Sequence, residues 1–186
     1  MNQKLVLVLG GDRSGKSQFA VTMASRISSH VLFVATAEPG DEEMRQRIQA
    51  HKRSRPAYWR TLEVATGIGA RLIKEIKNED VVVIDCLGLL VSNLLGKATD
   101  QAQPDKINIS KAEKLVDGEI KQLLKAISEI DASFIIVSNE VGLGLVPDNR
   151  LGRIYRDLLG SVNQKVAEKA DEVIFLVAGL PLKLKG

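Results

Sequence analysis

The stretch Gly10-Gly11-Asp12-Arg13-Ser14-Gly15-Lys16-Ser17 decides the fold. It matches the pattern G-x-x-x-x-G-K-[ST], follows an apolar run at residues 5–9 and opens an amphipathic segment at residues 18–27. A strand, a glycine-rich turn and a helix start in this order are typical of a phosphate-binding loop. The glycines let backbone N–H groups point at phosphate oxygens, and the positive helix end adds to the attraction. A glycine-rich turn without a ligand is the alternative, but it leaves the flanking pattern unexplained.

This loop predicts a protein that handles a nucleoside triphosphate. Lys16 would reach the β- and γ-phosphates, and the Ser17 hydroxyl would ligate Mg²⁺. Asp85 ends a second apolar run, residues 81–84. A carboxylate at the end of a neighbouring parallel strand would lie beside the loop and hold Mg²⁺ directly or through water. Many buried strands end in an aspartate, so this signal depends on the loop.

Composition limits the function classes. The chain has 186 residues, 45% hydrophobic and 26% charged, which fits one globular domain over residues 1–186. A formal charge of +3 and 4% aromatic residues argue against nucleic-acid binding. The single cysteine, Cys86, excludes an intrachain disulfide and is typical of a small buried residue in a reducing compartment. No apolar stretch is long enough for a signal segment or a membrane span, so we expect a cytoplasmic protein without stable membrane insertion.

Further apolar runs at residues 31–35, 134–137 and 173–177 are continuous rather than alternating, as in strands buried on both faces. Segments of helical period separate them, with stripes that include Ile68, Leu72, Ile73 and Ile76 and, later, Ile154, Leu158, Val162 and Val166. The alternation predicts an α/β fold, a P-loop NTPase-type three-layer sandwich with a mainly parallel central sheet. The polar tract 96–105 is expected to be an exposed loop, either a plain connection or a lid over the substrate.

A basic segment follows the second apolar run. Acidic residues are absent between Met44 and Leu62, where the basic residues are Arg45, Arg47, Lys52, Arg53, Arg55 and Arg60. Acidic residues 41–43 favour a helix start, and Pro56 ends the helix. The second half of this predicted helix is basic, and it forms either a face exposed to solvent or a cationic wall beside a triphosphate. His51, on the face of Met44 and Ile48, is either a half-buried residue or a nucleophile for phosphorus.

A third polar cluster, residues 138–147, follows the run 134–137. Its side chains should emerge at the same crevice as Asp85, with Asp148 or Asn149 as the cap of the next helix. Arg150, Arg153 and Arg156 form a basic stripe that faces solvent, a neighbouring subunit or phosphate, and the sequence does not separate these possibilities.

Taken together, these motifs resemble the bifunctional adenosylcobinamide kinase and adenosylcobinamide-phosphate guanylyltransferase family of cobalamin biosynthesis. The resemblance covers nearly the whole chain, at residues 10–17, 34–37, 41–44, 47–52, 55–63, 85–88, 92–95, 138–142, 156–157, 160, 163–164 and 178–181. The chain departs from the family at Asp12, where a small residue is usual, and at Ala50, where family members often carry a second histidine.

The resemblance implies that ATP or GTP phosphorylates the aminopropanol hydroxyl of adenosylcobinamide. GTP then transfers GMP to an enzyme histidine, here His51, and onward to adenosylcobinamide phosphate. The phosphate loop makes Lys16 the other predicted catalytic residue, and Ser17 and Asp85 are the predicted Mg²⁺ ligands. The resemblance further implies that the protein assembles as a homotrimer. The implied nucleotide contacts are Gly10, Gly11, Asp12, Arg13, Ser14, Gly15, Lys16, Ser17, Thr36, Ala37, Glu38, Lys52, Arg53, Ser54, Arg55, Glu63 and Asp85.

Two other functions stay open at this point. A small-molecule kinase without a histidine intermediate would use the same loop and leave His51 unmodified. A non-catalytic nucleotide switch would hydrolyse its nucleotide slowly and transfer nothing to an acceptor.

Overall fold

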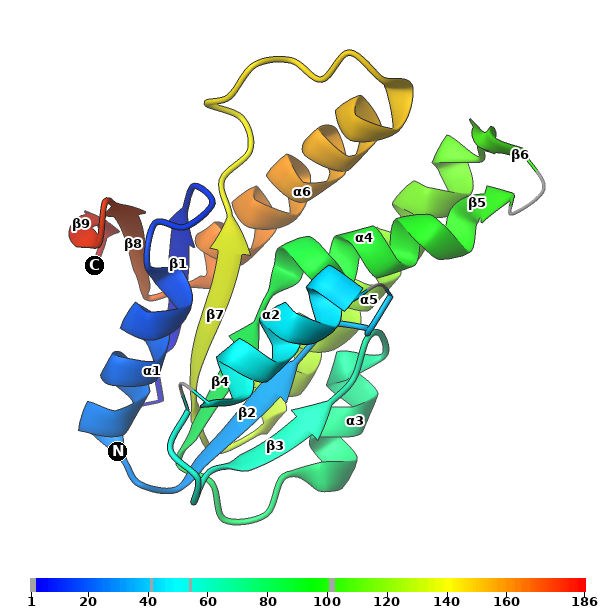
Figure 1. Cartoon of the computed structure of the whole chain (residues 1–186). Coiled ribbons are helices and arrows are strands. Elements are labelled where there is room, and N and C mark those ends of the chain that lie inside the picture. Colours follow the sequence, from blue (N-terminus) through cyan, green and yellow to red (C-terminus); the bar gives the residue numbers. More distant parts are fainter. Residues whose placement is uncertain (1–2, 41, 54, 101–102) are drawn as a thin grey trace.

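The computed structural model describes residues 3–40, 42–53, 55–100 and 103–186. Within these ranges, seven strands form the central sheet in the order β3-β2-β4-β7-β1-β8-β9 (Figure 1). All neighbouring strands run parallel except β9, which is antiparallel to β8. The strands are β1 (Leu5–Gly10), β2 (Val31–Ala35), β3 (Arg60–Glu63), β4 (Val81–Asp85), β7 (Ser133–Asn139), β8 (Glu172–Val177) and β9 (Leu180–Lys185).

Helices cover both faces of this sheet. Figure 1 shows α1 and α2 on the near face, with α4, α5 and α6 behind it. The helices are α1 (Lys16–Ile27), α2 (Glu42–Arg53), α3 (Ile68–Glu75), α4 (Leu87–Ala98), α5 (Ile109–Glu129) and α6 (Arg150–Lys169). No helix in the described ranges combines the length and the apolar character that crossing a membrane requires.

Alternate residues of the strands enter two separate hydrophobic cores. In β1, Leu5 and Leu7 pack with α3 to α6, whereas Val6 and Val8 pack with α1. Both sides of each central strand are therefore buried, which explains the continuous apolar runs in the sequence. The predicted α/β sandwich with a mainly parallel sheet is confirmed.

The two edge strands were absent from the sequence prediction. In β3 only Leu62 is buried, and every residue of β9 is exposed. Edge strands carry weak apolar signals because one side of each has no neighbouring strand.

The prediction of a loop at 96–105 was wrong in the described part of that tract. Helix α4 continues to Ala98, because Leu94, Leu95 and Ala98 are buried against the core. Beyond it, β5 (Thr99–Asp100) pairs with β6 (Gln103–Ile107) as an antiparallel hairpin. The apolar stripe of α3 is narrower than the sequence predicts, because Ile68 and Leu72 are buried but Ile73 is 53% exposed.

Candidate active site

The phosphate loop (residues 10–17) joins the end of β1 to the start of α1. A Cβ atom on Gly10 would lie 2.6 Å from both the Leu176 carbonyl oxygen and Ser14 Oγ, so this position accepts only glycine. Gly15 precedes the helix with φ of 93°, a left-handed conformation that glycine adopts without strain. The Gly179 amide donates to the Ser14 carbonyl at 3.0 Å, so the turn between β8 and β9 supports the loop.

The Lys16 side chain is held against its own loop. It is 7% exposed, and Nζ donates to the Gly11 carbonyl and, at 3.5 Å, to Ser14 Oγ. Burial lowers the pKa of Lys16, and the nearby Cys86, Asp12 and Asp85 oppose this shift. The ammonium group therefore has only neutral loop oxygens as partners in the described residues, and a phosphate would give it a charged one.

A cavity of about 770 Å³ opens above the phosphate loop, and we call it the loop cavity. Its floor is the loop, one wall is the basic helix α2, and the opposite wall is formed where β4 and β7 end. The carboxyl ends of parallel strands thus meet here, the usual ligand position in open α/β sheets. The lining residues are Asp12, Arg13, Ser14, Gly15, Lys16, Ser17, Gln18, Ala35, Ala37, Pro39, Arg45, Ile48, Gln49, Lys52, Arg55, Glu63, Asp85, Cys86, Leu89, Val137 and Asn139.

Most of the predicted nucleotide contacts lie in this lining, including residues 12–17, Ala37, Lys52, Arg55, Glu63 and Asp85. Gly10, Gly11, Thr36 and Glu38 are not part of the lining. Ser54 and the side chains of His51 and Arg53 lie outside the described residues, although α2 carries the His51 backbone between Ile48 and Lys52.

Thr36 lies behind the wall of the cavity rather than in it. It is fully buried, and its hydroxyl donates to the Cys86 carbonyl and accepts from the Cys86 amide, each at 2.8 Å. This exchange ties the end of β2 to the end of β4. Thr36 therefore fixes the position of the neighbouring Asp85.

Arg55 brings an incompletely paired guanidinium to the loop cavity. Its Cζ lies 3.6 Å from the centre of the Phe33 ring, and its buried Nη1 has no hydrogen-bond partner among the described residues. Burial lowers the pKa of Arg55, and the carboxylates of Asp85 and Glu63 oppose this shift. A buried cationic donor without a partner favours an anion beside it.

The described residues contain no group of three or more His, Cys, Asp or Glu side chains that could hold a metal by themselves. Mg²⁺ is usually held by one or two protein oxygens together with water and substrate phosphates. Ser17 and Asp85 both line the loop cavity, so the donor set fits this mode.

The polar cluster after β7 contributes one side chain to the cavity. Asn139 lines it, as predicted, but Ser138 is fully buried and its hydroxyl donates to Asn163 Oδ1 at 2.6 Å. The Glu140 carboxylate turns back and accepts from the Gly142 and Leu143 amides. The prediction for Ser138 was wrong because alternate residues of a strand point to opposite faces.

The arginine stripe on α6 braces the loop at residues 140–149. Arg153 Nη1 donates to the carbonyls of Pro147 and Asp148, and Arg156 Nη2 donates to Gly142 O at 2.8 Å. Asn149 is the helix cap, as predicted, and its side chain accepts from the Gly152 amide at 2.6 Å.

Sequence reasoning missed several residues of the lining. Arg45 and Gln49 share a helix face with Ile48 and Lys52, so spacing on the basic helix could have identified them. Leu89 carries no comparable signal, because the fold alone brings α4 to the loop.

A family model described as cobinamide kinase / cobinamide phosphate guanyltransferase matches residues 6–184. The bifunctional adenosylcobalamin biosynthesis protein CobU of Salmonella typhimurium is 39% identical over 97% of this chain and 99% of its own length. CobP of Pseudomonas aeruginosa, which has the same description, is 42% identical over 97% of this chain and 96% of its own.

Solved structures show the same fold at low identity. The RadB recombinase has a TM-score of 0.51 at 13% identity, covering 92% of this chain and 73% of its own. The ATPase domain of G40P has a TM-score of 0.52 at 17% identity, and the match covers 94% of this chain and 69% of the G40P chain. These likenesses support the P-loop NTPase-type architecture, while the near full-length sequence matches assign the family. The chain belongs to the cobinamide kinase / cobinamide phosphate guanyltransferase family and is a transferase of cobalamin biosynthesis.

Proposed function

We propose that this enzyme performs both transfers on adenosylcobinamide at the loop cavity. With ATP or GTP it phosphorylates the aminopropanol hydroxyl, and with GTP it converts the phosphate product to adenosylcobinamide-GDP. The observation that carries this proposal is the pairing of a phosphate loop with a basic helix across one cavity. The loop suits the triphosphate, and the helix supplies positive charge where negative charge develops during transfer.

In the phosphorylation, residues 10–17 cradle the triphosphate and Lys16 neutralises the β- and γ-phosphates. The acceptor oxygen attacks the γ-phosphorus, the bond to the β-phosphate oxygen breaks, and the hydroxyl proton leaves to water. Ser17 and Asp85 would hold Mg²⁺, which supplies charge neutralisation when it is bound. Asp85 lies in the same lining as Lys16, which supports this assignment.

In the guanylylation, a neutral imidazole nitrogen of His51 attacks the α-phosphorus of GTP, and pyrophosphate leaves. A phosphate oxygen of adenosylcobinamide phosphate then attacks the guanylyl-histidine, and the imidazole leaves. Support comes from the position of His51 on α2, three residues after Ile48 and one before Lys52, which both line the loop cavity. Residues three apart on a helix share a face. Lys52 and Arg55 would stabilise the charge on the α-phosphate.

The decisive test is a mass measurement after incubation with GTP labelled at the α-phosphate and denaturation. We expect an acid-labile GMP adduct on the wild type and none on His51→Ala. The chain has two histidines, so His30→Ala is a matched control. His30 is exposed and its Nδ1 lies 3.5 Å from Asp80, so this variant should form the adduct normally.

An adduct on His51→Ala would disprove the histidine assignment. Cobinamide-dependent phosphorylation without any adduct on the wild type would leave a kinase lacking the histidine step. Slow hydrolysis without transfer would instead identify a nucleotide switch.

The remaining predictions complete the proposal. We expect one catalytic domain over residues 1–186, a homotrimer, a cytoplasmic location and no nucleic-acid partner. Sedimentation analysis measures the assembly directly, and a monomeric or dimeric mass would contradict the trimer.

A further inference from the structure

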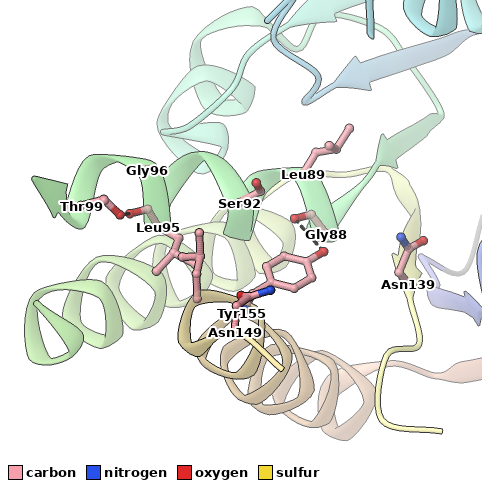
Figure 2. A pocket seen from close by; sticks show the side chains of 11 residues that line it. Gly88, Leu89, Ser92, Leu95, Gly96, Thr99, Asn139, Asn149 and Tyr155 are labelled. Carbon is pink, nitrogen blue, oxygen red and sulfur yellow. Dashed lines mark hydrogen bonds between the residues drawn. The ribbon is translucent and has the colours of Figure 1, made fainter. Parts of the chain in front are cut away.

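A second cavity, of about 600 Å³, lies between α4 and α6, and we call it the α4–α6 cavity. Figure 2 shows Ser92 and Leu95 of α4 and Tyr155 of α6 among its lining. The Tyr155 hydroxyl donates to the Gly88 carbonyl at 3.3 Å, a bond that joins the two helices. Burial raises the pKa of Tyr155 to about 12, so this hydroxyl stays protonated and neutral. None of the residues described above as nucleotide contacts lines this cavity.

The α4–α6 cavity adjoins the loop cavity. Leu89 and Asn139 line both, so these two side chains form the partition between them. Asn139 is the register partner of Gly10, the first residue of the phosphate loop. Its carboxamide has no hydrogen-bond partner within the described ranges, and a Cβ on Gly88 would lie 3.7 Å from its Nδ2. The half-buried Asn139 side chain is therefore available to hydrogen-bond a ligand at the junction of the two cavities.

The two cavities differ in charge. Lys16, Arg45, Lys52 and Arg55 line the loop cavity, whereas the α4–α6 cavity has no charged side chain among its described lining residues. Its polar groups are hydroxyls and carboxamides set among leucines and glycines. Such a lining suits a neutral arm with amide and hydroxyl groups, and it disfavours a phosphate or a nucleotide.

We propose that the α4–α6 cavity is the acceptor subsite, which takes the hydroxyl-ended side arm of cobinamide and presents it past Asn139 to the nucleotide. This inference rests on the proposed function, since it names where the acceptor of that reaction binds. The Asn139 carboxamide hydrogen-bonds the end of the arm, and Leu89 packs against its methylene groups. Once phosphorylated, the end of the arm lies on the cationic side of the partition.

The corrin ring lies outside the cavity, because a macrocycle with its side chains exceeds 600 Å³. We place the ring against the loop at residues 140–149, because both ends of that loop reach the cavity lining. The loop at residues 140–149 is flanked by Asn139 and ends at Asn149, and both residues line the cavity. Its side chains include Leu143, which is 81% exposed, and Leu145, which is 97% exposed. A large ligand resting on this loop would cover side chains that otherwise face water.

Gly96 gives a clean way to test the subsite. It lies on α4, lines the α4–α6 cavity and not the loop cavity, and a Cβ there would meet nothing within 4 Å. Gly96→Leu therefore adds a side chain at the cavity lining whose Cβ meets no neighbour, and it replaces a poor helix former by a good one. Gly118→Leu is the matched control, because Gly118 is a helical glycine with open space that lines neither cavity.

The measurement is equilibrium dialysis of cobinamide, followed by its visible absorbance, with a non-hydrolysable GTP analogue present. We expect Gly96→Leu to weaken cobinamide binding by about tenfold or more, the usual effect of a misfitting side chain in a ligand pocket. Affinity for the GTP analogue should stay at the wild-type value, and Gly118→Leu should bind both ligands normally. Ser92→Leu, at an exposed position of the same lining, is the second variant and should weaken cobinamide binding too.

Wild-type affinity for cobinamide in both Gly96→Leu and Ser92→Leu would overturn the subsite. A changed oligomeric mass with unchanged cobinamide affinity would also overturn it, since the cavity would then be a contact between subunits. Failure of the wild type to bind cobinamide at all would instead count against the proposed function, so the two failures are distinguishable.

Discussion

Lys52 Nζ and Glu63 Oε1 lie 2.5 Å apart, so an ion pair joins the helix that carries His51 to the edge strand β3. Both side chains line the loop cavity, and both are substantially exposed, at 41% and 59%. An exposed ion pair contributes only about 0–1 kcal/mol to folding. We therefore expect its main effect to be the orientation of two charged groups toward the proposed nucleotide site.

Glu63→Gln should therefore change nucleotide binding and not stability. The variant removes a charged acceptor and releases Lys52, and we expect about tenfold weaker GTP binding by calorimetry. The melting temperature should stay within about 2 °C of the wild-type value. Lys52→Gln and the double variant complete a double-mutant cycle, which gives the coupling free energy between Lys52 and Glu63 in GTP binding. Unchanged GTP affinity in Glu63→Gln would show that the pair only attaches α2 to the sheet.

Lys16→Ala should abolish transfer of the γ-phosphate. The ammonium lies over the phosphate loop with carbonyl and hydroxyl oxygens as partners, and it would exchange them for phosphate oxygens. Losing a preorganised charge of this kind costs roughly 100-fold or more in rate. The assay is cobinamide-dependent formation of nucleoside diphosphate, with thermal unfolding to verify folding. Full activity in Lys16→Ala would mean that the triphosphate binds elsewhere.

Cys86 should resist alkylation in the folded enzyme. Burial raises the pKa of its thiol from 9.0 to about 12, the carboxylate of Asp85 adds to the shift, and the nearby Lys16 opposes it. A raised pKa leaves the thiol protonated at pH 8.5, so the reactive thiolate is about a thousandfold scarcer than in an ordinary cysteine. Iodoacetamide labelling followed by mass spectrometry measures this, with urea-unfolded protein as the reactive control. Equal rates in both samples would contradict the burial of Cys86.

Glu119 should be a major contributor to stability. This buried residue of α5 accepts hydrogen bonds from the Gly67 and Ile68 amides at the start of α3, both at 2.8 Å. Glu119→Ala leaves two donors unpaired, and we expect the free energy of unfolding to fall by about 2–3 kcal/mol. Glu119→Gln keeps one acceptor and should lose less. Urea denaturation measures both, and equal losses would show that side-chain packing, not the hydrogen bonds, matters.

Arg156 should hold the loop at residues 140–149 in place. Its bond to the Gly142 carbonyl spans from α6 to the loop, and Arg156→Ala removes it. We expect faster amide exchange at residues 142–146 and little change in the melting temperature. Arg150→Ala is the control, because Arg150 is an exposed residue at the start of the same helix. Identical amide exchange rates in both variants would show that the hydrogen bond from Arg156 to Gly142 does not hold the loop.

Local patterns predicted much of this molecule. The phosphate loop is recognisable because its glycines, Lys16 and Ser17 are adjacent in sequence, and buried strands are recognisable because both of their faces need apolar residues. Strand β9 was missed because Leu180, Leu182 and Leu184 lie on an exposed edge. The tie between Thr36 and Cys86 spans 50 residues, and no local pattern reports a contact at that separation.

The lining of the α4–α6 cavity could not be predicted from local sequence patterns either. Ser92 comes from α4 and Tyr155 from α6, and each is an ordinary residue in its own segment, whereas Asn139 of β7 belongs to the polar cluster that the sequence places beside Asp85. Only the packing of these elements around the end of the sheet brings the side chains together. The sequence predicts the nucleotide side of the site because phosphate recognition uses one contiguous loop, whereas acceptor recognition uses scattered surfaces.

The sequence contains one G-x-x-x-x-G-K-S stretch, and the loop cavity opens above it in the part of the chain that the structure describes. Both proposed transfers therefore use the same phosphate loop and cannot occur in one subunit at the same time. A subunit that holds GTP for guanylylation excludes ATP as a phosphate donor at that moment. A high GTP concentration should therefore inhibit ATP-dependent phosphorylation competitively. The ratio of GTP to ATP would then set the relative rates of phosphorylation and guanylylation.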